Sequence, residues 1–353
     1  MAEKTSGKWK KIITLATLLA LVVLIYVSRD QIGETLSDLG KVQTSFLLLI
    51  VVWKFAVFHG YTKMYIGMFQ ILGKSLRYWP MFKVTLELNF VNNVFPSGGV
   101  TGFSYFSLKM HEFGISAGKS TLIQAMRFIN TFVTFQFFIL AGLLILAAAG
   151  QAGNLTILVA SSLATLLLVG TVLLGYVIRS RERISGFFTF LTKIINRLIH
   201  LVRPNNPETI SVAAARKMFY ELHDNYLEIK KDLRKLKKPL LYMSLANFGE
   251  IAALYSVFLA FGETVNLGAV IIAYAIANFA GLISVLPGGV GIYEGLMVGV
   301  LAAGGVPPAI SIPAVIMYRI LTMSLQLPIG YYFYHQTINS TGGLGKNDAK
   351  FNG

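Results

Sequence analysis

The sequence predicts an all-α polytopic membrane protein. Of its 353 residues, 55% are hydrophobic and only 13% are charged, whereas about 25% of the residues of a soluble protein are charged. The uncharged residues fall in runs of about 20, the length that a helix needs to cross the hydrocarbon core of a bilayer. This composition excludes an ordinary soluble fold.

The charge balance and the lack of cysteine exclude several classes of function. The net charge of +15 first reflects the basic loops that membrane proteins keep on the cytoplasmic side, so we do not expect nucleic acid as a partner. Without cysteine there are no disulfides, thiolate metal ligands or cysteine nucleophiles, and the five histidines form no HxxxH or HExxH motif. We expect no metal and no cofactor.

Residues 1–30 predict an N-terminal membrane helix with a cytoplasmic N-terminus. Four lysines in the first 11 residues precede an apolar run from Ile12 to Val27. A signal peptide is the alternative, but no small-residue cleavage site follows Val27, and further spans do. The next apolar run, about Phe46 to Phe69, then crosses from outside to inside.

Residues 44–178 predict a first membrane repeat unit that contains a broken hairpin, followed by a connecting helix. The apolar run from Met81 to Phe95 is short for a span, and Pro96-Ser97-Gly98-Gly99 interrupts it. Two half-helices joined in this way describe a re-entrant hairpin, which membranes tolerate where protein or water satisfies the freed backbone groups. Long helices are predicted from Ser120 to Ala149 and from Leu155 to Ile178.

Residues 179–238 predict a basic helical hairpin in the cytoplasm. This segment carries 14 Lys and Arg against 6 Asp and Glu, and one of its helical patterns suits a helix lying among anionic headgroups. A solvated hairpin on the bilayer surface is one interpretation. The other is a docking site for a cytoplasmic enzyme within residues 184–238.

Residues 239–335 predict a second membrane repeat unit, and residues 336–353 a cytoplasmic tail. A span from Pro239 to Phe261 precedes a second short apolar run, which is broken at Pro287-Gly288-Gly289-Val290-Gly291. A short helix and a last long helix, about Pro308 to Tyr334, follow. In all, we expect six crossings and two re-entrant hairpins, with both termini in the cytoplasm of a prokaryote.

The two units form an internal repeat. Arg127 lies 31 residues after Pro96, and Arg319 lies 32 residues after Pro287. Each arginine begins a polar stripe on one helix face; the stripes are Arg127, Asn130, Thr131 and Thr134, and Arg319, Thr322, Met323 and Gln326. Three crossings separate the starts of the units, so the units are inverted. Inverted repeats with broken helices are typical of alternating-access transporters, which bind substrate near the midplane.

The repeat defines the candidate site. Candidate substrate-binding residues lie in the two turns and on the two stripes: Pro96, Gly98, Gly99, Pro287, Gly288, Gly289, Gly291, Glu294, Arg127, Asn130, Arg319 and Gln326. Candidate charge-balancing residues are Glu87, Glu250 and His59. A charge in the bilayer centre costs at least about 2.5 kcal/mol, so each should face the protein interior, a partner or a cavity.

Two of the acids have more than one interpretation. Glu87 could pair with Lys83 one turn before it. Glu294 could favour the dipole of its helix, bind a proton or a cation, or be the counter-ion of an arginine or of a cationic headgroup. The glycine amides of both turns would form a phosphate cradle.

The motifs resemble those of the lysylphosphatidylglycerol synthase transmembrane, or flippase-like, family. The resembling stretches are residues 92–99, 286–295, 305–308 and 318–322. Family members often carry an acid shortly after the first Gly-Gly, where this chain has Thr101-Gly102-Phe103, and an arginine where it has Tyr293. The resemblance implies a membrane module that moves or presents polar lipids. It does not imply aminoacyl transfer, because the soluble catalytic domain of the transferring members has no counterpart in this sequence.

We therefore expect a flippase-like transporter of a polar phospho- or glycolipid, whose partners are lipids with anionic or zwitterionic headgroups. One alternative is a non-transporting scaffold for a lipid-modifying or glycosyl-transferring enzyme. A second is a lipid transferase such as phosphatidylglycerol lysyltransferase, although the acids of the sequence are isolated and form no catalytic constellation. We do not expect an enzyme.

Overall fold

The computed structural model is all-helical in the residues that it describes, which confirms the predicted fold class. These residues are 19, 22–23, 25–26, 29–95, 100–183, 186, 221, 223–283 and 289–340. Five described helices are long and apolar enough to cross a membrane: α3 (Thr44–Ile71), α6 (Ala117–Ala148), α7 (Asn154–Ile178), α10 (Lys237–Ala260) and α13 (Pro308–Ser340). They correspond to five of the six predicted crossings. The sixth, Ile12 to Val27, lies largely outside the described residues.

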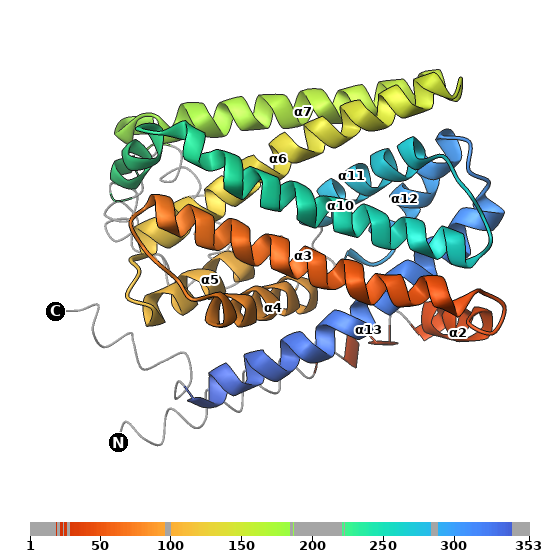
Figure 1. Cartoon of the computed structure of the whole chain (residues 1–353), viewed down its shortest axis with the longest axis horizontal. Helices are drawn as coiled ribbons and strands as arrows, with labels where there is room; N and C mark the ends of the chain where they lie inside the picture. Colours follow the sequence, from red (N-terminus) through yellow and green to blue (C-terminus); the bar gives the residue numbers. More distant parts are fainter. Residues whose placement is uncertain are drawn as a thin grey trace, which may run out of the picture.

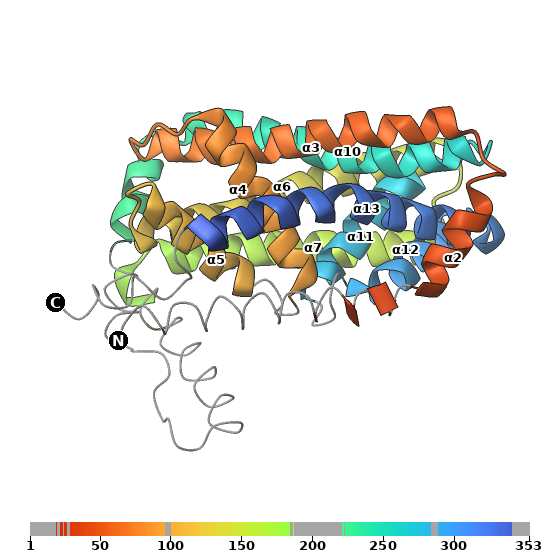
Figure 2. The ribbon, with the colours of Figure 1, turned by 90° about the horizontal axis from the view of Figure 1, so that it is seen from below.

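Helices α3 and α10 form the central pair and run antiparallel, side by side in both views (Figures 1 and 2). The amide of Gln43, before α3, donates to the carbonyl of Ala260, at the end of α10, at 2.8 Å. A Cβ on Gly60 would lie 2.6 Å from the Tyr242 carbonyl oxygen. The two backbones thus touch, as small residues allow between membrane helices.

Two pairs of short helices complete the bundle. Helix α4 (Tyr78–Val94) is followed by α5 (Val100–Glu112), and α11 (Leu267–Ile283) is followed by α12 (Ile292–Ala303). The helices of each pair pack against each other, and each pair leaves and returns to the same end of the bundle. The predicted half-helices therefore exist as helices. The break residues 96–99, and residues 287–288 of the second break, lie outside the described part.

The contacts between the two halves of the chain are reciprocal. Helix α4 packs against α13, and α11 packs against α6. Both contacts use a glycine of the long helix. A Cβ on Gly330 would lie 2.9 Å from the Leu86 carbonyl oxygen, and one on Gly142 would lie 3.0 Å from the Gly268 carbonyl oxygen. The first short helix of each half thus packs against the last long helix of the repeat unit in the other half.

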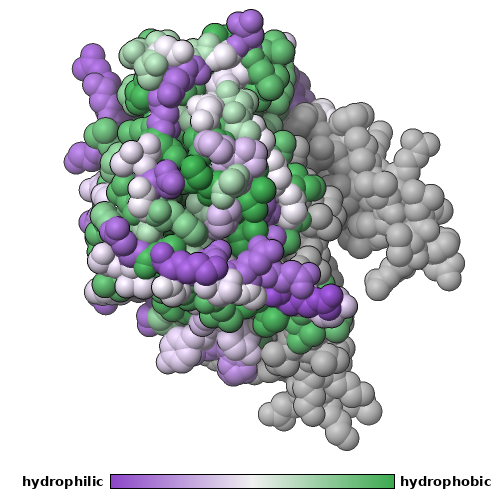
Figure 3. Space-filling model, turned by 90° about the vertical axis from the view of Figure 1, so that its right-hand side faces the viewer, coloured by the Kyte–Doolittle hydropathy of each residue, from purple (hydrophilic) through white to green (hydrophobic). Residues whose placement is uncertain are grey.

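The two ends of the bundle differ in charge. One end, called the basic end, holds residues 72–77, 112–119, 179–183 and 230–238, and Lys119 reaches the Leu72 carbonyl there. Its described cations are Lys74, Arg77, Lys119, Arg179, Arg181, Arg183, Lys230, Lys231, Arg234, Lys235, Lys237 and Lys238. The opposite end holds residues 39–43, 149–156, 261–266 and 303–307, where Asn266 donates to Gln151 and Thr156 to Ala303. Figure 3 views this opposite end, where hydrophilic and apolar residues are interspersed.

Most of the predicted cytoplasmic hairpin lies outside the described residues. Its described final part packs on the basic end: Ile229 is buried in a cluster with Val177 and Met243. Arg181 and Asp224 form an ion pair between the end of α7 and this segment.

Candidate functional site

Arg319 on α13 and Glu294 in the first turn of α12 form a buried ion pair. The Arg319 Nε atom lies 2.9 Å from Glu294 Oε1, and both side chains are about one-tenth exposed or less. The guanidinium also lies over the Tyr293 ring, 4.3 Å from its centroid. Of the interpretations of Glu294, the geometry matches the counter-ion of an arginine.

Glu294 also caps its own helix. Its Oε2 atom accepts a hydrogen bond from the Gly291 amide at 2.6 Å. Gly289 and Gly291 have φ angles of 67° and 87°, a left-handed region that side chains other than glycine adopt at a cost. The carboxylate therefore ties the glycine turn, the start of α12 and the middle of α13 together.

A second ion pair joins three helices beside the first. Lys54 on α3 lies 2.7 Å from Glu250 on α10, and the Tyr318 hydroxyl of α13 donates to the same carboxylate at 2.7 Å. Tyr318 directly precedes Arg319 in the chain. Glu250 is thus held by a lysine and a tyrosine, and Lys54 is a partner that the sequence analysis did not place in the site.

Arg127 on α6 has no acidic partner among the described residues. Its guanidinium lies next to the Tyr65 hydroxyl and 5.0 Å from the centroid of the Phe128 ring. Its Nε atom is buried and donates no hydrogen bond within the described chain. Arg127 and Arg319, which the repeat treats as equivalent, therefore differ in their surroundings.

The rest of the α6 stripe also faces the protein interior. Asn130 is buried, and its Nδ2 atom has no hydrogen-bond partner in the described structure. Thr134 accepts a hydrogen bond from Asn247 of α10 at 2.7 Å. On α13, Gln326 is buried as well. Most of both predicted stripes is thus buried, whereas Arg127 and Thr131 are partly exposed.

Buried tyrosines, which the sequence analysis missed, surround these charges. They are Tyr65, Tyr274, Tyr293 and Tyr318. Tyr293 and Tyr318 directly precede Glu294 and Arg319 in the sequence, a signal that could have identified them. A hydroxyl can donate or accept, so these side chains can solvate a charged group in the place of water.

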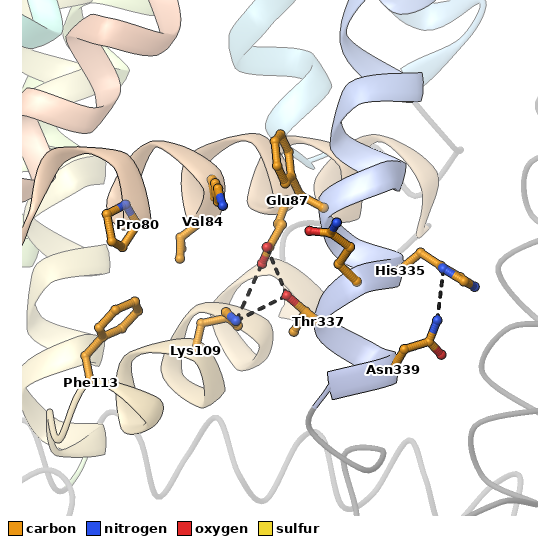
Figure 4. A pocket seen from close by; sticks show the side chains of 11 residues that line it. Pro80, Val84, Glu87, Lys109, Phe113, His335, Thr337 and Asn339 are labelled. Atoms are coloured by element: carbon orange, nitrogen blue, oxygen red, sulfur yellow. Dashed lines mark hydrogen bonds and ion pairs between the residues drawn. The ribbon is translucent and has the colours of Figure 1, made fainter.

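Glu87 belongs to a separate site at the basic end (Figure 4). Its carboxylate accepts hydrogen bonds from Tyr105 at 2.5 Å and from Thr337 at 3.0 Å, and Lys109 lies 3.9 Å away. The suggested pair with Lys83 is not formed, because Lys83 instead lies over the Phe333 ring, 5.4 Å from its centroid. Tertiary contacts with α5 and α13 thus replace the intrahelical pair.

Glu87 lines an open pocket of about 630 Å³ between α4, α5 and the end of α13. Lys83 and Lys109 add positive charge to its wall, and Phe113 and Phe333 add apolar surface. The pocket opens near the basic end and is a candidate for contact with polar headgroups.

Of the remaining candidate residues, His59 is described and does not contact the central ion pairs. His59 lies beside Tyr78, with 2.9 Å between its Nδ1 atom and the hydroxyl oxygen. Pro96, Gly98, Gly99, Pro287 and Gly288 lie outside the described residues.

Known proteins match this chain over most of its length. It is 25% identical over 331 residues to a UPF0104 membrane protein of Methanothermobacter thermautotrophicus, covering 90% of this chain and 92% of the relative. It is 23% identical over 334 residues to a UPF0104 membrane protein of Methanocaldococcus jannaschii, covering 91% and 92%. The family model described as the lysylphosphatidylglycerol synthase TM region matches residues 12–330. The chain therefore belongs to the family of the lysylphosphatidylglycerol synthase TM region.

Proposed function

We propose that this protein is a flippase-like transporter that moves a polar phospho- or glycolipid across the cytoplasmic membrane of a prokaryote. The observation that carries the proposal is the pair of buried donors on α6, Arg127 Nε and Asn130 Nδ2, which have no hydrogen-bond partner in the described structure. Buried donors are nearly always satisfied in folded proteins, so such groups mark a place for a ligand or water.

The polar residues extend over both halves of the bundle. Arg127 lies in the half of α6 near the basic end, whereas Arg319 lies in the half of α13 near the opposite end. Together with Glu250 and the tyrosines, they provide polar groups at several depths. A headgroup crossing an apolar bundle needs such groups, since an unsatisfied polar group in hydrocarbon costs several kcal/mol.

The packing supports an inverted repeat and alternating access. Helices α3 to α6 form one unit and α10 to α13 the other, with α3 paired to α10 and with the reciprocal contacts α4 to α13 and α11 to α6. In this proposal, each short helix pair is a re-entrant hairpin, and the units rock against each other around the α3–α10 pair.

We place the basic end in the cytoplasm, because cytoplasmic loops of membrane proteins are rich in lysine and arginine. Helix α13 ends there, so the tail from residue 336 starts in the cytoplasm. Helix α2 (Arg29–Asp38) leads into α3 at the opposite end. If residues 12–27 cross once, the N-terminus returns to the cytoplasm. Headgroups would enter from the inner leaflet near the pocket beside Glu87.

Flipping of a headgroup-labelled phospholipid in reconstituted vesicles tests the proposal. Wild-type protein should expose inner-leaflet label to an impermeant reductant faster than protein-free vesicles do. Arg127→Gln should slow this exposure, whereas the control Lys63→Gln, which removes a cation lying over the Tyr78 ring, should not.

The same experiment separates the alternatives. A wild-type protein that does not accelerate exposure of any phospho- or glycolipid contradicts transport. If that protein instead retains a lipid-modifying enzyme through purification, the scaffold alternative is supported.

A further inference from the structure

The two equivalent arginines differ in charge compensation. Arg319 is neutralised by Glu294 at 2.9 Å, and Lys54 and Glu250 neutralise each other at 2.7 Å. Arg127 forms no ion pair with a described residue. Glu250 lies within electrostatic reach of the same Tyr61 hydroxyl as Arg127, but its carboxylate is already held by Lys54 and Tyr318. The described central site therefore holds one uncompensated positive charge.

The local sequence explains this difference. In the second unit, Glu294 supplies the carboxylate seven residues after Pro287. The corresponding part of α5, residues 101–104, contains no acid. Instead, Phe103 stacks on Phe128 with 5.6 Å between ring centroids and 9° between planes, and Arg127 lies over the same Phe128 ring. An aromatic pair thus occupies the region where the second unit has a counter-ion.

We propose that Arg127 and Asn130 form the open anion site among the described residues of the bundle centre and bind the phosphate of a lipid headgroup with one net negative charge, while the ion pair with Glu294 keeps Arg319 from binding an anion. This inference rests on the proposed function and deepens it by naming the substrate class. The Nε atom of Arg127 is buried without a hydrogen-bond partner in the described structure, which favours a counter-charge at this arginine, and a phosphodiester oxygen pair matches its planar set of donors.

The same charges disfavour zwitterionic headgroups. The ammonium group of such a headgroup needs a carboxylate, and the two described acids of the central site, Glu250 and Glu294, are already paired. A headgroup whose only charge is its phosphodiester leaves the site neutral. Asn130 Nδ2, buried and without a partner, supplies a second donor close to Arg127, three residues away on the same helix face.

Binding measurements with short-chain lipids test the inference separately from transport. The protein, purified in a neutral detergent, is titrated by calorimetry with dihexanoyl phosphatidylglycerol, with dihexanoyl phosphatidylcholine and with inorganic phosphate. We expect one phosphatidylglycerol per chain and at least about tenfold weaker binding of phosphatidylcholine. Inorganic phosphate binding as tightly as phosphatidylglycerol would assign the site to free phosphate and overturn the headgroup assignment.

Three variants distinguish the two arginines. Arg127→Gln should weaken phosphatidylglycerol binding at least about tenfold. Arg319→Gln should leave the stoichiometry at one phosphatidylglycerol per chain. Glu294→Gln should free Arg319 and raise the stoichiometry toward two. Equal losses for Arg127→Gln and Arg319→Gln, in proteins with unchanged elution on size exclusion, would overturn the inference.

Transport can fail independently of this site. One bound phosphatidylglycerol that requires Arg127, in a protein that does not flip lipid, supports the anion site and contradicts the transport proposal. Flipping of phosphatidylcholine as fast as phosphatidylglycerol supports transport and contradicts the charge selectivity.

Discussion

Glu294 uses its two carboxylate oxygens to join Arg319 to the glycine turn before α12: Arg319 Nε lies 2.9 Å from Oε1, and Oε2 accepts the Gly291 amide at 2.6 Å. One side chain therefore fixes the start of a short helix, a positive-φ glycine and a buried guanidinium. Because both ionic partners are buried, removing one leaves a charge that water does not reach, and this makes the pair a sensitive test of the central site.

Loss of the carboxylate should destabilise the protein when no anion is present. In neutral detergent we expect Glu294→Gln to lower the free energy of unfolding by about 3–5 kcal/mol, since Arg319 remains buried without this partner. The double variant Glu294→Gln/Arg319→Met should recover much of the loss. Thermal unfolding followed by circular dichroism measures both. A single variant as stable as the wild type would contradict a strong dependence on this pair.

The positive φ of Gly291 should make its substitution costly. A Cβ there has nothing within 4 Å, so the cost of Gly291→Ala comes from the backbone conformation alone, with φ 87° and ψ −50°, and is about 1–3 kcal/mol for such a sparsely populated region. Gly295→Ala, also with open space but within α12, is the matched control and should be neutral or stabilising. Equal melting temperatures for the two variants would contradict the expectation.

Lys109 should stabilise the basic-end site more than Lys83 does. Lys109 is buried beside Glu87 and Glu112, at 3.9 and 2.8 Å, whereas Lys83 is exposed over an aromatic ring. We expect Lys109→Met to cost about 3 kcal/mol, because it leaves a buried carboxylate without its cation, and Lys83→Met to cost less than about 1 kcal/mol. Denaturant titration of both variants checks the order, and a reversed order would contradict the assigned roles.

Labelling of single cysteines should confirm that the basic end lies inside the cell. The chain has no native cysteine, so Lys74→Cys and Lys41→Cys report on the two ends, both at exposed positions. In intact cells an impermeant maleimide should label position 41 and should label position 74 only after lysis. Labelling of position 74 from outside would reverse the proposed orientation.

An acidic side chain at position 103 should neutralise Arg127 and thereby weaken anion binding. Phe103→Glu places a carboxylate in the first turn of α5, next to the ring on which Arg127 lies, whereas Phe103→Gln has nearly the same shape without the charge. We expect the glutamate variant to bind phosphatidylglycerol at least about tenfold more weakly than the glutamine variant. Equal affinities would show that position 103 does not face Arg127.

The sequence by itself determined where the helices lie and which charged residues the protein interior has to accommodate. Long uncharged runs require helices in a bilayer, because every backbone polar group must be satisfied within the segment. The broken runs predicted α4, α5, α11 and α12, and the periodicity predicted that Arg127 and Arg319 begin stripes facing the interior. Local composition and spacing carry this information.

Only the tertiary structure decided which charges meet. Lys54 and Glu250 lie 196 residues apart in the chain, and Glu87 reaches Thr337 across 250 residues, so helix packing, not spacing, sets these partners. For the same reason the structure does not follow the interpretation in which Glu87 pairs with Lys83. The two arginines look equivalent in sequence, yet Glu294 reaches Arg319 while an aromatic pair lies next to Arg127. The charge that such an arginine presents depends on what the fold places against it, because the attraction between two charges rises as they approach and is strongest where the protein excludes water.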